Sequence, residues 1–321
     1  MKLQKSLHNP KYNTSNKVIF LLGPTGIGKS KFALEIAKLI PIEIINADSK
    51  QIYKFMNIGT SKPNIQELKL VKHHLINLIN PNEEFSLQEF LNKAKTTINK
   101  IANNNKFPVI VGGTNQYITA LIEGWNPPIV KANKELRNKY QDLINKNGSE
   151  FLFQQLQAID PETAIKIHPN NHRRLIRALE IIETTGTKIS TLTRKIKPEY
   201  DFIAIALTTS RNILYSLIDK RVDLMLKNGL EQEVKTLLKK GYSKNNPGIN
   251  SIGYGEIIDY LEKKISHEKA IQLMKYRTHK LVRQQYTWLN ARKFNITFID
   301  INNNPMKIAK KILMDFINSK H

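Results

Sequence analysis

Eight residues near the N-terminus have the types and spacing of a loop that binds phosphate. They are Gly23, Pro24, Thr25, Gly26, Ile27, Gly28, Lys29 and Ser30, and they fit the pattern G-x-x-x-x-G-K-[ST]. Glycines let a backbone wrap closely around an anion, so that successive N–H groups point at it. In this pattern Lys29 faces the terminal phosphates and the Ser30 hydroxyl binds Mg²⁺. The competing interpretation is a glycine-rich turn that binds nothing.

A single carboxylate, Asp48, is well placed to work beside this loop. Short apolar runs predict buried strands at residues 18–22, 42–46 and 108–111. Ligands of parallel sheets bind at the carboxyl ends of the strands, so Asp48, Thr114 and the loop should converge. One carboxylate facing an anion cradle suits a reaction in which diphosphate leaves and a proton is removed. An ATPase or GTPase would need a further acid at a strand end. The competing interpretation of Asp48 is a helix N-cap.

Two groups of basic residues have the spacing of a nucleic-acid contact. Arg173, Arg174 and Arg177 lie on one expected helix and share a face, which suits phosphate contacts. A second group interleaves cations with aromatic residues, as stacking on nucleic acid requires: Lys275, Tyr276, Arg277, Lys280, Arg283, Tyr286 and Trp288. Solvated basic faces and core aromatics are the competing interpretations.

The elements that must position these residues alternate between strands and helices. Helical patterns follow at residues 31–40 and 86–102, the second opened by a capping box of Ser86 and Glu89. From about residue 131 to 195 the patterns are helical only, and Asp160–Pro161 is a cap followed by a first turn. A strand is expected again at 201–207 and a last one at 294–301; the expected later helices are near 211–240, 254–264, 267–292 and 305–318.

This order predicts an α/β fold: a P-loop core with a parallel sheet wrapped by helices, and an all-helical insertion. The expected divisions are a flexible lead at 1–16, a core at 17–125 and 200–321, and an insertion at 126–199.

Composition narrows the class of partner and the compartment. The chain of 321 residues has a net charge of +23, which favours nucleic acid as a partner, although Lys-, Asn- and Ile-rich coding bias also contributes cations. Cysteine is absent, which fits a reducing cytoplasm. We expect no signal peptide, no membrane span and no metal site among His73, His74, His168, His172 and His279, whose spacing does not suit ligands.

In combination, the motifs resemble those of the tRNA dimethylallyltransferases, the isopentenyl or IPP transferase family. The resemblance runs in collinear order from roughly residue 18 to 290. It is carried by Gly23-Pro24-Thr25-x-x-Gly28-Lys29-Ser30, Ala47-Asp48-Ser49-x-Gln51-Ile52-Tyr53, Ile58-Gly59-Thr60-Ser61-Lys62-Pro63, Val111-Gly112-Gly113-Thr114-x-x-Tyr117, Ile167-His168-Pro169-Asn170, Arg174-x-x-Arg177-Ala178-Leu179-Glu180, Arg221-Val222-Asp223-x-Met225, Ile252-Gly253-Tyr254-x-Glu256 and Gln285-x-Thr287-Trp288.

The resemblance implies transfer of a dimethylallyl group from dimethylallyl diphosphate to the exocyclic amine of the adenine 3′ of the tRNA anticodon. It implies catalytic roles for Asp48, Thr114 and Lys29, diphosphate or nucleotide binding by residues 23–30, and Mg²⁺ on Ser30. The residues implied to contact the tRNA anticodon stem-loop are Asp48, Ser49, Lys50, Gln51, Thr114, Arg137, Arg173, Arg174, Leu175, Ile176, Arg177, Gly253 and Tyr254. We expect a cytoplasmic monomer with Mg²⁺ as its cofactor and an ATP- or nucleotide-binding phosphate loop.

Three positions depart from the family pattern. Leu217, Gly255 and Gln284 stand where the family usually has basic residues, and Arg211 or Arg221 is a candidate to compensate. These departures keep open the alternative of a weakened or inactive tRNA-binding protein. Two further alternatives are a P-loop nucleotide kinase or NTPase and an enzyme acting on free adenine nucleotides.

Overall fold

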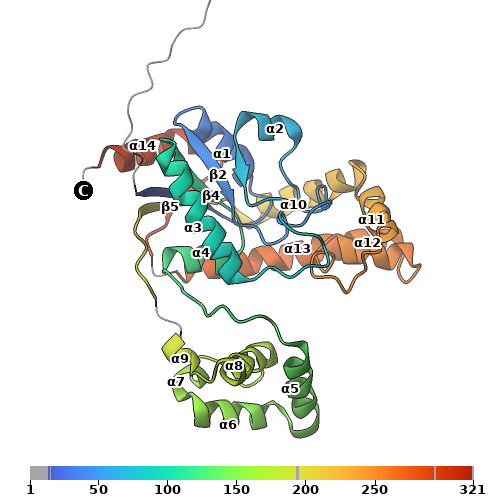
Figure 1. Cartoon of the computed structure of the whole chain (residues 1–321). Coiled ribbons are helices and arrows are strands. Elements are labelled where there is room, and N and C mark those ends of the chain that lie inside the picture. The colour runs from blue at the N-terminus through green and yellow to red at the C-terminus, as the bar shows by residue number, and fades with distance from the viewer. Residues whose placement is uncertain (1–13, 15, 193–194, 293, 320–321) are drawn as a thin grey trace, which may run out of the picture. The chain divides into compact units, whose positions relative to one another are not determined.

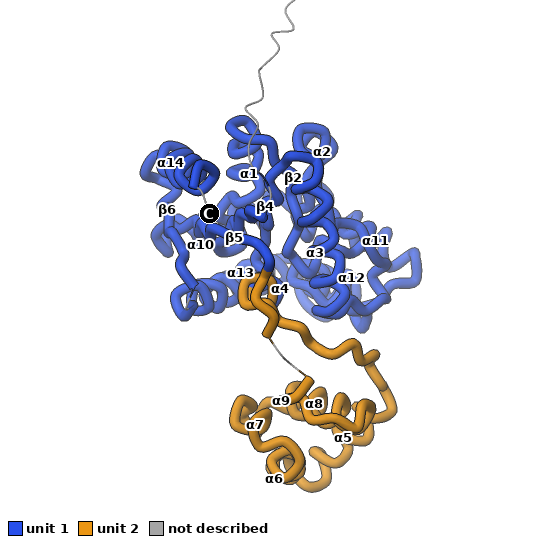
Figure 2. Tube along the Cα trace, turned by 60° about the vertical axis from the view of Figure 1, so that its left-hand side comes forward, with its two compact units in different colours: residues 1–118, 199–321 blue, residues 119–198 orange. Residues whose placement is uncertain are grey.

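The chain divides by compactness into two units (Figure 2). The computed structural model describes residues 14, 16–192, 195–292 and 294–319. The larger unit is formed by residues 1–118 and 199–321, and the smaller unit by residues 119–198. The flexible lead predicted at 1–16 lies almost wholly outside the described residues. The domain boundaries predicted at 125/126 and 199/200 remain a proposal.

A parallel sheet forms the centre of the larger unit, and its strand order is β3-β2-β4-β1-β5-β6. The strands are β1 Lys17–Leu22, β2 Ile42–Asn46, β3 His73–His74, β4 Phe107–Val111, β5 Asp201–Thr208 and β6 Thr297–Asp300. Every neighbouring pair runs parallel, so the predicted α/β fold is confirmed. No sequence pattern predicts β3, because two residues are too few to show a period.

Strands β1, β2 and β4 are buried along their whole length, as in parallel sheets covered on both faces. Ile19 and Leu21 of β1 share a core cluster with residues of α1, α10 and α14. The registers pair Leu21 with Val111, so the carboxyl ends of β1 and β4 lie side by side.

Helices surround this sheet, and Figure 1 shows α3 crossing one of its faces. The helices of the larger unit are α1 Lys29–Ala37, α2 Ile65–Leu70, α3 Leu87–Asn103, α4 Asn115–Ile122, α10 Arg211–Lys227, α11 Leu230–Lys239, α12 Tyr254–Leu261, α13 His267–Asn290 and α14 Pro305–Asn318, of which α4 passes into the smaller unit at Thr119. The capping box of Ser86 and Glu89 opens α3 as predicted. The helical structure predicted near 211–240 consists of two helices, because Gly229, with a φ of 94°, separates α10 from α11.

Among its described residues the smaller unit contains the end of α4 and five complete helices, and the helical prediction for this segment is confirmed there. The complete helices are α5 Lys134–Asn147, α6 Ser149–Ile159, α7 Pro161–Ala164, α8 His172–Thr185 and α9 Ile189–Leu192. Asp160 caps α7 through its contact with the Thr163 N–H, and Pro161 occupies the first turn. Leu152, Leu156, Leu175 and other apolar residues form a separate core for this unit.

Candidate active site

The phosphate loop has a backbone that only glycine tolerates at three positions. It connects β1 to α1, and Gly23, Gly26 and Gly28 have φ values of 138°, 83° and 96°. At Gly23 a Cβ would also lie 2.8 Å from the Leu207 carbonyl oxygen, so a side chain is excluded by space as well. The loop ends at the N-terminus of α1, where Ser30 is exposed. Backbone N–H groups and the positive end of α1 therefore favour a bound anion here.

The Lys29 side chain folds back onto the phosphate loop that precedes it. Its Nζ donates to the carbonyl oxygens of Gly23 at 2.9 Å and of Pro24 at 2.8 Å. Burial lowers the pKa of the Lys29 ammonium to about 8, although Asp48 opposes this shift, and the charge of Arg221 lowers the pKa further. An anion in the loop would raise that pKa again, because an opposite charge favours the protonated amine.

Asp48 follows β2 and caps a turn. Its Oδ1 accepts from the Lys50 N–H at 2.8 Å, and the residues that follow form turns, so the helix N-cap interpretation is wrong. The Asn46 side chain bonds both the N–H and the carbonyl oxygen of Asp48, at 3.3 and 3.1 Å. The half-buried carboxylate acts on the pKa values of Lys29, Lys50 and Arg221, raising each against the effect of burial.

Thr114 lies directly against the turn that carries Asp48. Its Oγ1 accepts from the Ser49 N–H at 2.9 Å, and its own N–H donates to the Ala47 carbonyl at 3.1 Å. A Cβ on Gly112 would lie 2.2 Å from that same carbonyl oxygen, so glycine is required where the two turns meet. The structure thus brings together Asp48 and Thr114, as the sequence predicts from their places at strand ends.

Gln285 connects the phosphate loop with the turn after β4. From α13, its Oε1 accepts from the Thr25 N–H at 2.8 Å, and its Nε2 donates to the Gly113 carbonyl at 2.9 Å. The side chain is only 5% exposed. Sequence reasoning assigned no role to Gln285. Helical spacing could have singled it out, since Val282 and Leu289, three before and four after it, are apolar and buried.

Arg221, one of the two arginines named as candidates to compensate for Leu217, contacts the phosphate loop directly. It donates from Nη1 to Thr25 Oγ1 at 2.6 Å and from Nε to Ser61 Oγ at 3.1 Å. Of the two candidates to replace the arginine expected at Leu217, Arg221 reaches the loop. Arg211 lies instead over the ring of Tyr215, 5.9 Å from its centroid.

Lys50 and Gln51, which follow Asp48 and are predicted to contact tRNA, form hydrogen bonds with loops of the larger unit. Lys50 Nζ donates to the Pro247 and Asn250 carbonyls, each at 3.0 Å. Gln51 Nε2 donates to the Thr60 and Ser61 carbonyls at 3.1 and 3.2 Å. Both side chains therefore shape the site, and their contact with RNA stays a prediction.

Gly253 and Tyr254 lie behind the loop of residues 57–60. Gly253 has a φ of 99°, and Tyr254 is fully buried. The Tyr254 hydroxyl donates to Glu233 Oε1 at 2.7 Å, and Glu233 also accepts backbone N–H groups from residues 57–59. The Tyr254 side chain therefore supports this loop and is enclosed, so the RNA contact predicted for it needs correction.

The arginines of the smaller unit differ in their partners. Glu180 is fully buried, and it accepts from Arg137 Nε at 3.0 Å and from Arg177 Nη1 at 2.7 Å. Those hydrogen bonds keep the pKa of the Glu180 carboxyl low against the effect of burial. Arg173 and Arg174 are exposed. Of the three arginines expected to share a face for phosphate contacts, Arg177 is therefore paired with a buried carboxylate.

Leu175 and Ile176 are also predicted to contact tRNA, but their side chains face the interior of the smaller unit. Their side chains are 0% and 8% exposed and belong to the core of the smaller unit. They pack the helix that carries Arg173 and Arg174, so an RNA contact of these two apolar side chains is ruled out by their burial. A contact between RNA and the two exposed arginines stays a prediction.

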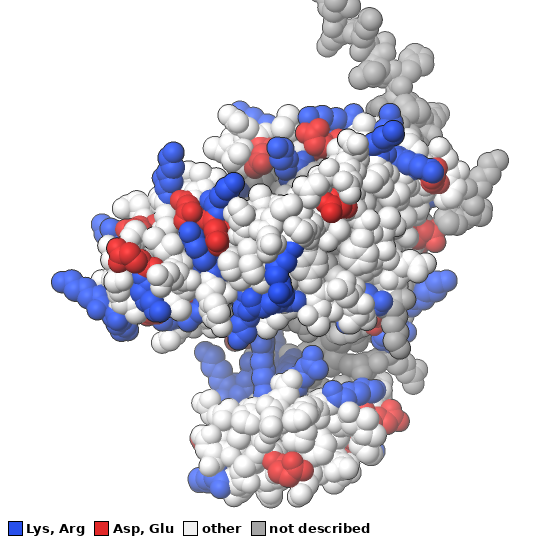
Figure 3. All heavy atoms as spheres, turned by 180° about the vertical axis from the view of Figure 1, so that it is seen from behind, with Lys and Arg blue, Asp and Glu red and all other residues white. Residues whose placement is uncertain are grey.

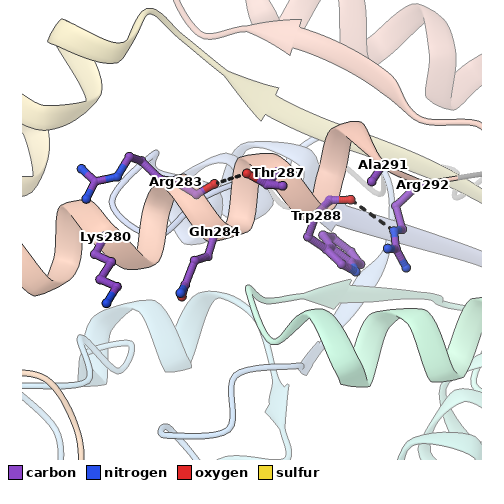
Figure 4. Close-up of a pocket in the computed structure, with 7 residues that line it drawn as sticks. All are labelled: Lys280, Arg283, Gln284, Thr287, Trp288, Ala291 and Arg292. Atoms are coloured by element: carbon purple, nitrogen blue, oxygen red, sulfur yellow. Dashed lines mark hydrogen bonds between the residues drawn. The ribbon is translucent and has the colours of Figure 1, made fainter. Parts of the chain in front are cut away.

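A shallow pocket of about 580 Å³ lies along α13. Figure 4 shows Lys280, Gln284 and Trp288 extending from one side of the helix, with Arg283 extending away from them. The other cations of the predicted basic group are paired, Lys275 with Asp223 at 2.7 Å and Arg277 with Glu256 at 2.6 Å. This part of the helix therefore combines cations with an aromatic surface, and Figure 3 shows that Lys and Arg are widespread on one face of the molecule.

Two kinds of feature are missing from the part of the chain that the structure describes. It contains no group of three or more His, Cys, Asp or Glu side chains that could hold a metal ion. Nor does any helix there have the length and apolarity to cross a membrane.

Known proteins resemble the chain over most of its length. A family model described as "IPP transferase" matches residues 51–292. The tRNA dimethylallyltransferase of Thermoanaerobacter sp. (strain X514) is 41% identical over 303 residues, which cover 92% of this chain and 96% of that protein. That of Alkaliphilus oremlandii is 41% identical over 306 residues, which cover 94% and 97%.

Solved structures agree with these relatives. The tRNA isopentenylpyrophosphate transferase of Bacillus halodurans has a TM-score of 0.69 at 34% identity, covering 94% of this chain and 97% of that one. A eukaryotic dimethylallyltransferase acting on tRNA has a TM-score of 0.80 at 30% identity, covering 96% of this chain and 81% of that one. The chain belongs to the IPP transferase family.

Proposed function

We propose that this chain transfers the dimethylallyl group of dimethylallyl diphosphate to the exocyclic amine of the adenine 3′ of the tRNA anticodon. One observation carries the proposal: an anion-binding loop and a single carboxylate, Asp48, lie at the same edge of the sheet, close enough for Asp48 to influence the Lys29 ammonium. The family and the names of its relatives point to the same reaction.

The phosphate loop receives the diphosphate. Backbone N–H groups of residues 23–30 and the N-terminus of α1 face the anion, and Lys29 and Arg221 supply full charges beside it. As the bond between the allylic carbon and the diphosphate oxygen breaks, its electron pair leaves with the oxygen. Positive groups fixed at that oxygen stabilise the developing charge.

Asp48 and Thr114 act on the acceptor. The adenine amine is a weak nucleophile because its lone pair is delocalised into the ring, so positioning contributes much of the rate. The new bond joins that nitrogen to the allylic carbon, and Asp48 accepts the proton that the nitrogen loses. The adenine must leave its stack to reach the site, at a cost of about a few kcal/mol.

A Mg²⁺ ion fits the residues present. Mg²⁺ is commonly held by one or two protein oxygens together with substrate phosphates and waters. The exposed Ser30 hydroxyl at the start of α1 is such an oxygen, next to the loop that receives the diphosphate. When bound, the ion would neutralise charge on the diphosphate.

Exposed cations bind the RNA. We assign phosphate contacts to Arg173 and Arg174 of the smaller unit and to Lys280 on α13, with Trp288 available for stacking. The net charge of +23 suits this partner. We further propose that the protein acts as a cytoplasmic monomer, and the lack of cysteine suits a reducing compartment.

A prenyl-transfer assay tests the function. Purified protein is incubated with radiolabelled dimethylallyl diphosphate, Mg²⁺ and unmodified tRNA whose anticodon is followed by adenines. Label should enter the tRNA, and Asp48→Asn should abolish most of it, whereas Asp315→Asn, at an exposed position on α14, should not. Binding of tRNA without any transfer of label would reject the proposal and leave an inactive RNA-binding protein. Turnover of ATP without tRNA would indicate a kinase or NTPase.

A further inference from the structure

We propose that Gln285 is a positioning residue that sets the distance between the diphosphate loop and the acceptor side of the site. The inference rests on the proposed function, because it concerns the same reaction. It starts from the two hydrogen bonds that the buried Gln285 amide makes to segments on two different strands, Thr25 after β1 and Gly113 after β4.

The first of these bonds orients the peptide between Pro24 and Thr25. Its N–H donates to Gln285 Oε1 at 2.8 Å, and its carbonyl accepts from Lys29 Nζ at 2.8 Å. The N–H and C=O of a trans peptide point in opposite directions, so one contact at each end fixes the plane. Gln285 thereby determines where the Pro24 carbonyl holds the Lys29 ammonium.

The second bond continues to the acceptor side. Gln285 Nε2 donates to the Gly113 carbonyl at 2.9 Å, and the next residue, Thr114, accepts from the Ser49 N–H beside Asp48. A chain of contacts therefore runs from Lys29 through Gln285 to Thr114. The spacing is tight, because a Cβ on Gly113 would lie 2.5 Å from Gln285 Nε2 and 3.9 Å from Lys29 Nζ.

Only an amide in this orientation satisfies both partners. An N–H must meet an acceptor and a carbonyl must meet a donor, so the side chain requires one oxygen and one nitrogen at its end. The support is firm as well, because Gln285 projects from α13, a helix of 24 residues whose Val282 and Leu289 are buried on the same side. These features suit a fixed spacer between two groups that must meet in one transition state.

Misplacement of catalytic groups by about 1 Å can lower a rate about 10²-fold. We therefore expect Gln285→Met, which keeps the length and loses both bonds, to lower kcat roughly 10- to 100-fold. The KM for tRNA should change little, because Gln285 is buried and contacts loops of the enzyme. Gly113→Ala should act in the same direction, since its methyl group displaces the Gln285 amide while leaving that side chain in the sequence.

The experiment measures kcat and KM of prenyl transfer for the two single variants, for the double variant and for Gln272→Met, an exposed glutamine on the same helix. If Gln285 and Gly113 act through the same spacing, the kcat of the double variant should fall no further than that of the more impaired single variant, because the effects of coupled sites are not additive. Gln272→Met should match the wild type, and thermal unfolding should verify that every variant is folded.

The outcomes separate the two proposals. Without label transfer by the wild-type chain, the proposed function fails. With an active wild type, an unchanged kcat in folded Gln285→Met overturns the positioning role. So does a double variant in which the two losses in kcat multiply.

Discussion

The Nη1 atom of Arg221 donates to the Oγ1 of Thr25 at 2.6 Å, joining two residues that are 196 positions apart in the chain. Arg221 comes from α10, and Thr25 from the phosphate loop, whose N–H at the same residue is bonded to Gln285. The loop is therefore held by two helices that follow it late in the chain. Arg221 therefore places a positive charge beside the phosphate loop, four residues after Leu217, where the family resemblance leads us to expect a basic residue.

Replacing Arg221 should weaken binding of the diphosphate. Arg221→Met keeps a long apolar stem and removes the charge and both donors, to Thr25 and to Ser61. Hydrogen bonds to charged groups are worth about 1.5–3 kcal/mol, so we expect affinity for inorganic diphosphate to fall about 10- to 100-fold. Calorimetric titration measures this, with Arg211→Met as the control. Equal affinity of Arg221→Met and wild type would contradict the placement.

Diphosphate binding should weaken as the pH rises through about 8, where Lys29 loses its proton in the free protein. Bound anion requires the ammonium form, so protons are taken up on binding above that pH. Titrations with diphosphate between pH 7 and 9.5 should show this decline in the wild type and a flatter profile in Lys29→Met. Identical profiles would argue against Lys29 as the group that titrates.

The lowered pKa of Lys29 also makes the stability of the fold depend on pH. Because the pKa of Lys29 is lower in the folded state, the unfolded chain binds more protons between about pH 8 and 10.5. The contribution of Lys29 to the free energy of unfolding therefore rises with pH across this window. Urea unfolding at several pH values should show the free energy of unfolding of the wild type rising relative to that of Lys29→Met as the pH increases from about 8 to 10.5.

Lys17 should be a large contributor to stability outside the active site. It is 3% exposed, and its Nζ donates to the carbonyls of Phe316, Ile317 and Ser319 at 2.6, 3.0 and 2.9 Å, where α14 ends. An ammonium at a helix C-terminus satisfies carbonyls that lack partners. We expect Lys17→Met to lower the free energy of unfolding by about 2–3 kcal/mol. The exposed Lys311→Met on the same helix is the control, and an equal loss in both would reject this role.

Arg173 and Arg174 should control the salt dependence of tRNA binding. Each phosphate contact contributes about one unit to the slope of log affinity against log salt. The double variant Arg173→Met/Arg174→Met should therefore reduce that slope by about two. Filter binding across a range of salt concentrations measures it, with Lys310→Met/Lys311→Met on α14 as a control of equal charge. An unchanged slope would place the phosphate contacts elsewhere.

Much of the site was predictable where a few neighbouring residues determine the structure. Local periodicity identifies the buried strands before the phosphate loop and before Asp48. Short motifs identify the glycines and Lys29 of the loop, and the cap at Ser86 depends on hydrogen bonds within about one turn. From strand ends alone, the sequence also predicted that Asp48 and Thr114 meet, because carboxyl ends of parallel strands share an edge.

Tertiary packing alone decided which partner each of the other side chains has. Gln285 bonds to Thr25 across 260 positions, Tyr254 is enclosed against Glu233, and Arg177 bonds to the buried Glu180. The helical period shows that such residues lie on an inner face. Which distant loop or charge lies opposite depends on how the helices pack, and no short segment of sequence contains that information.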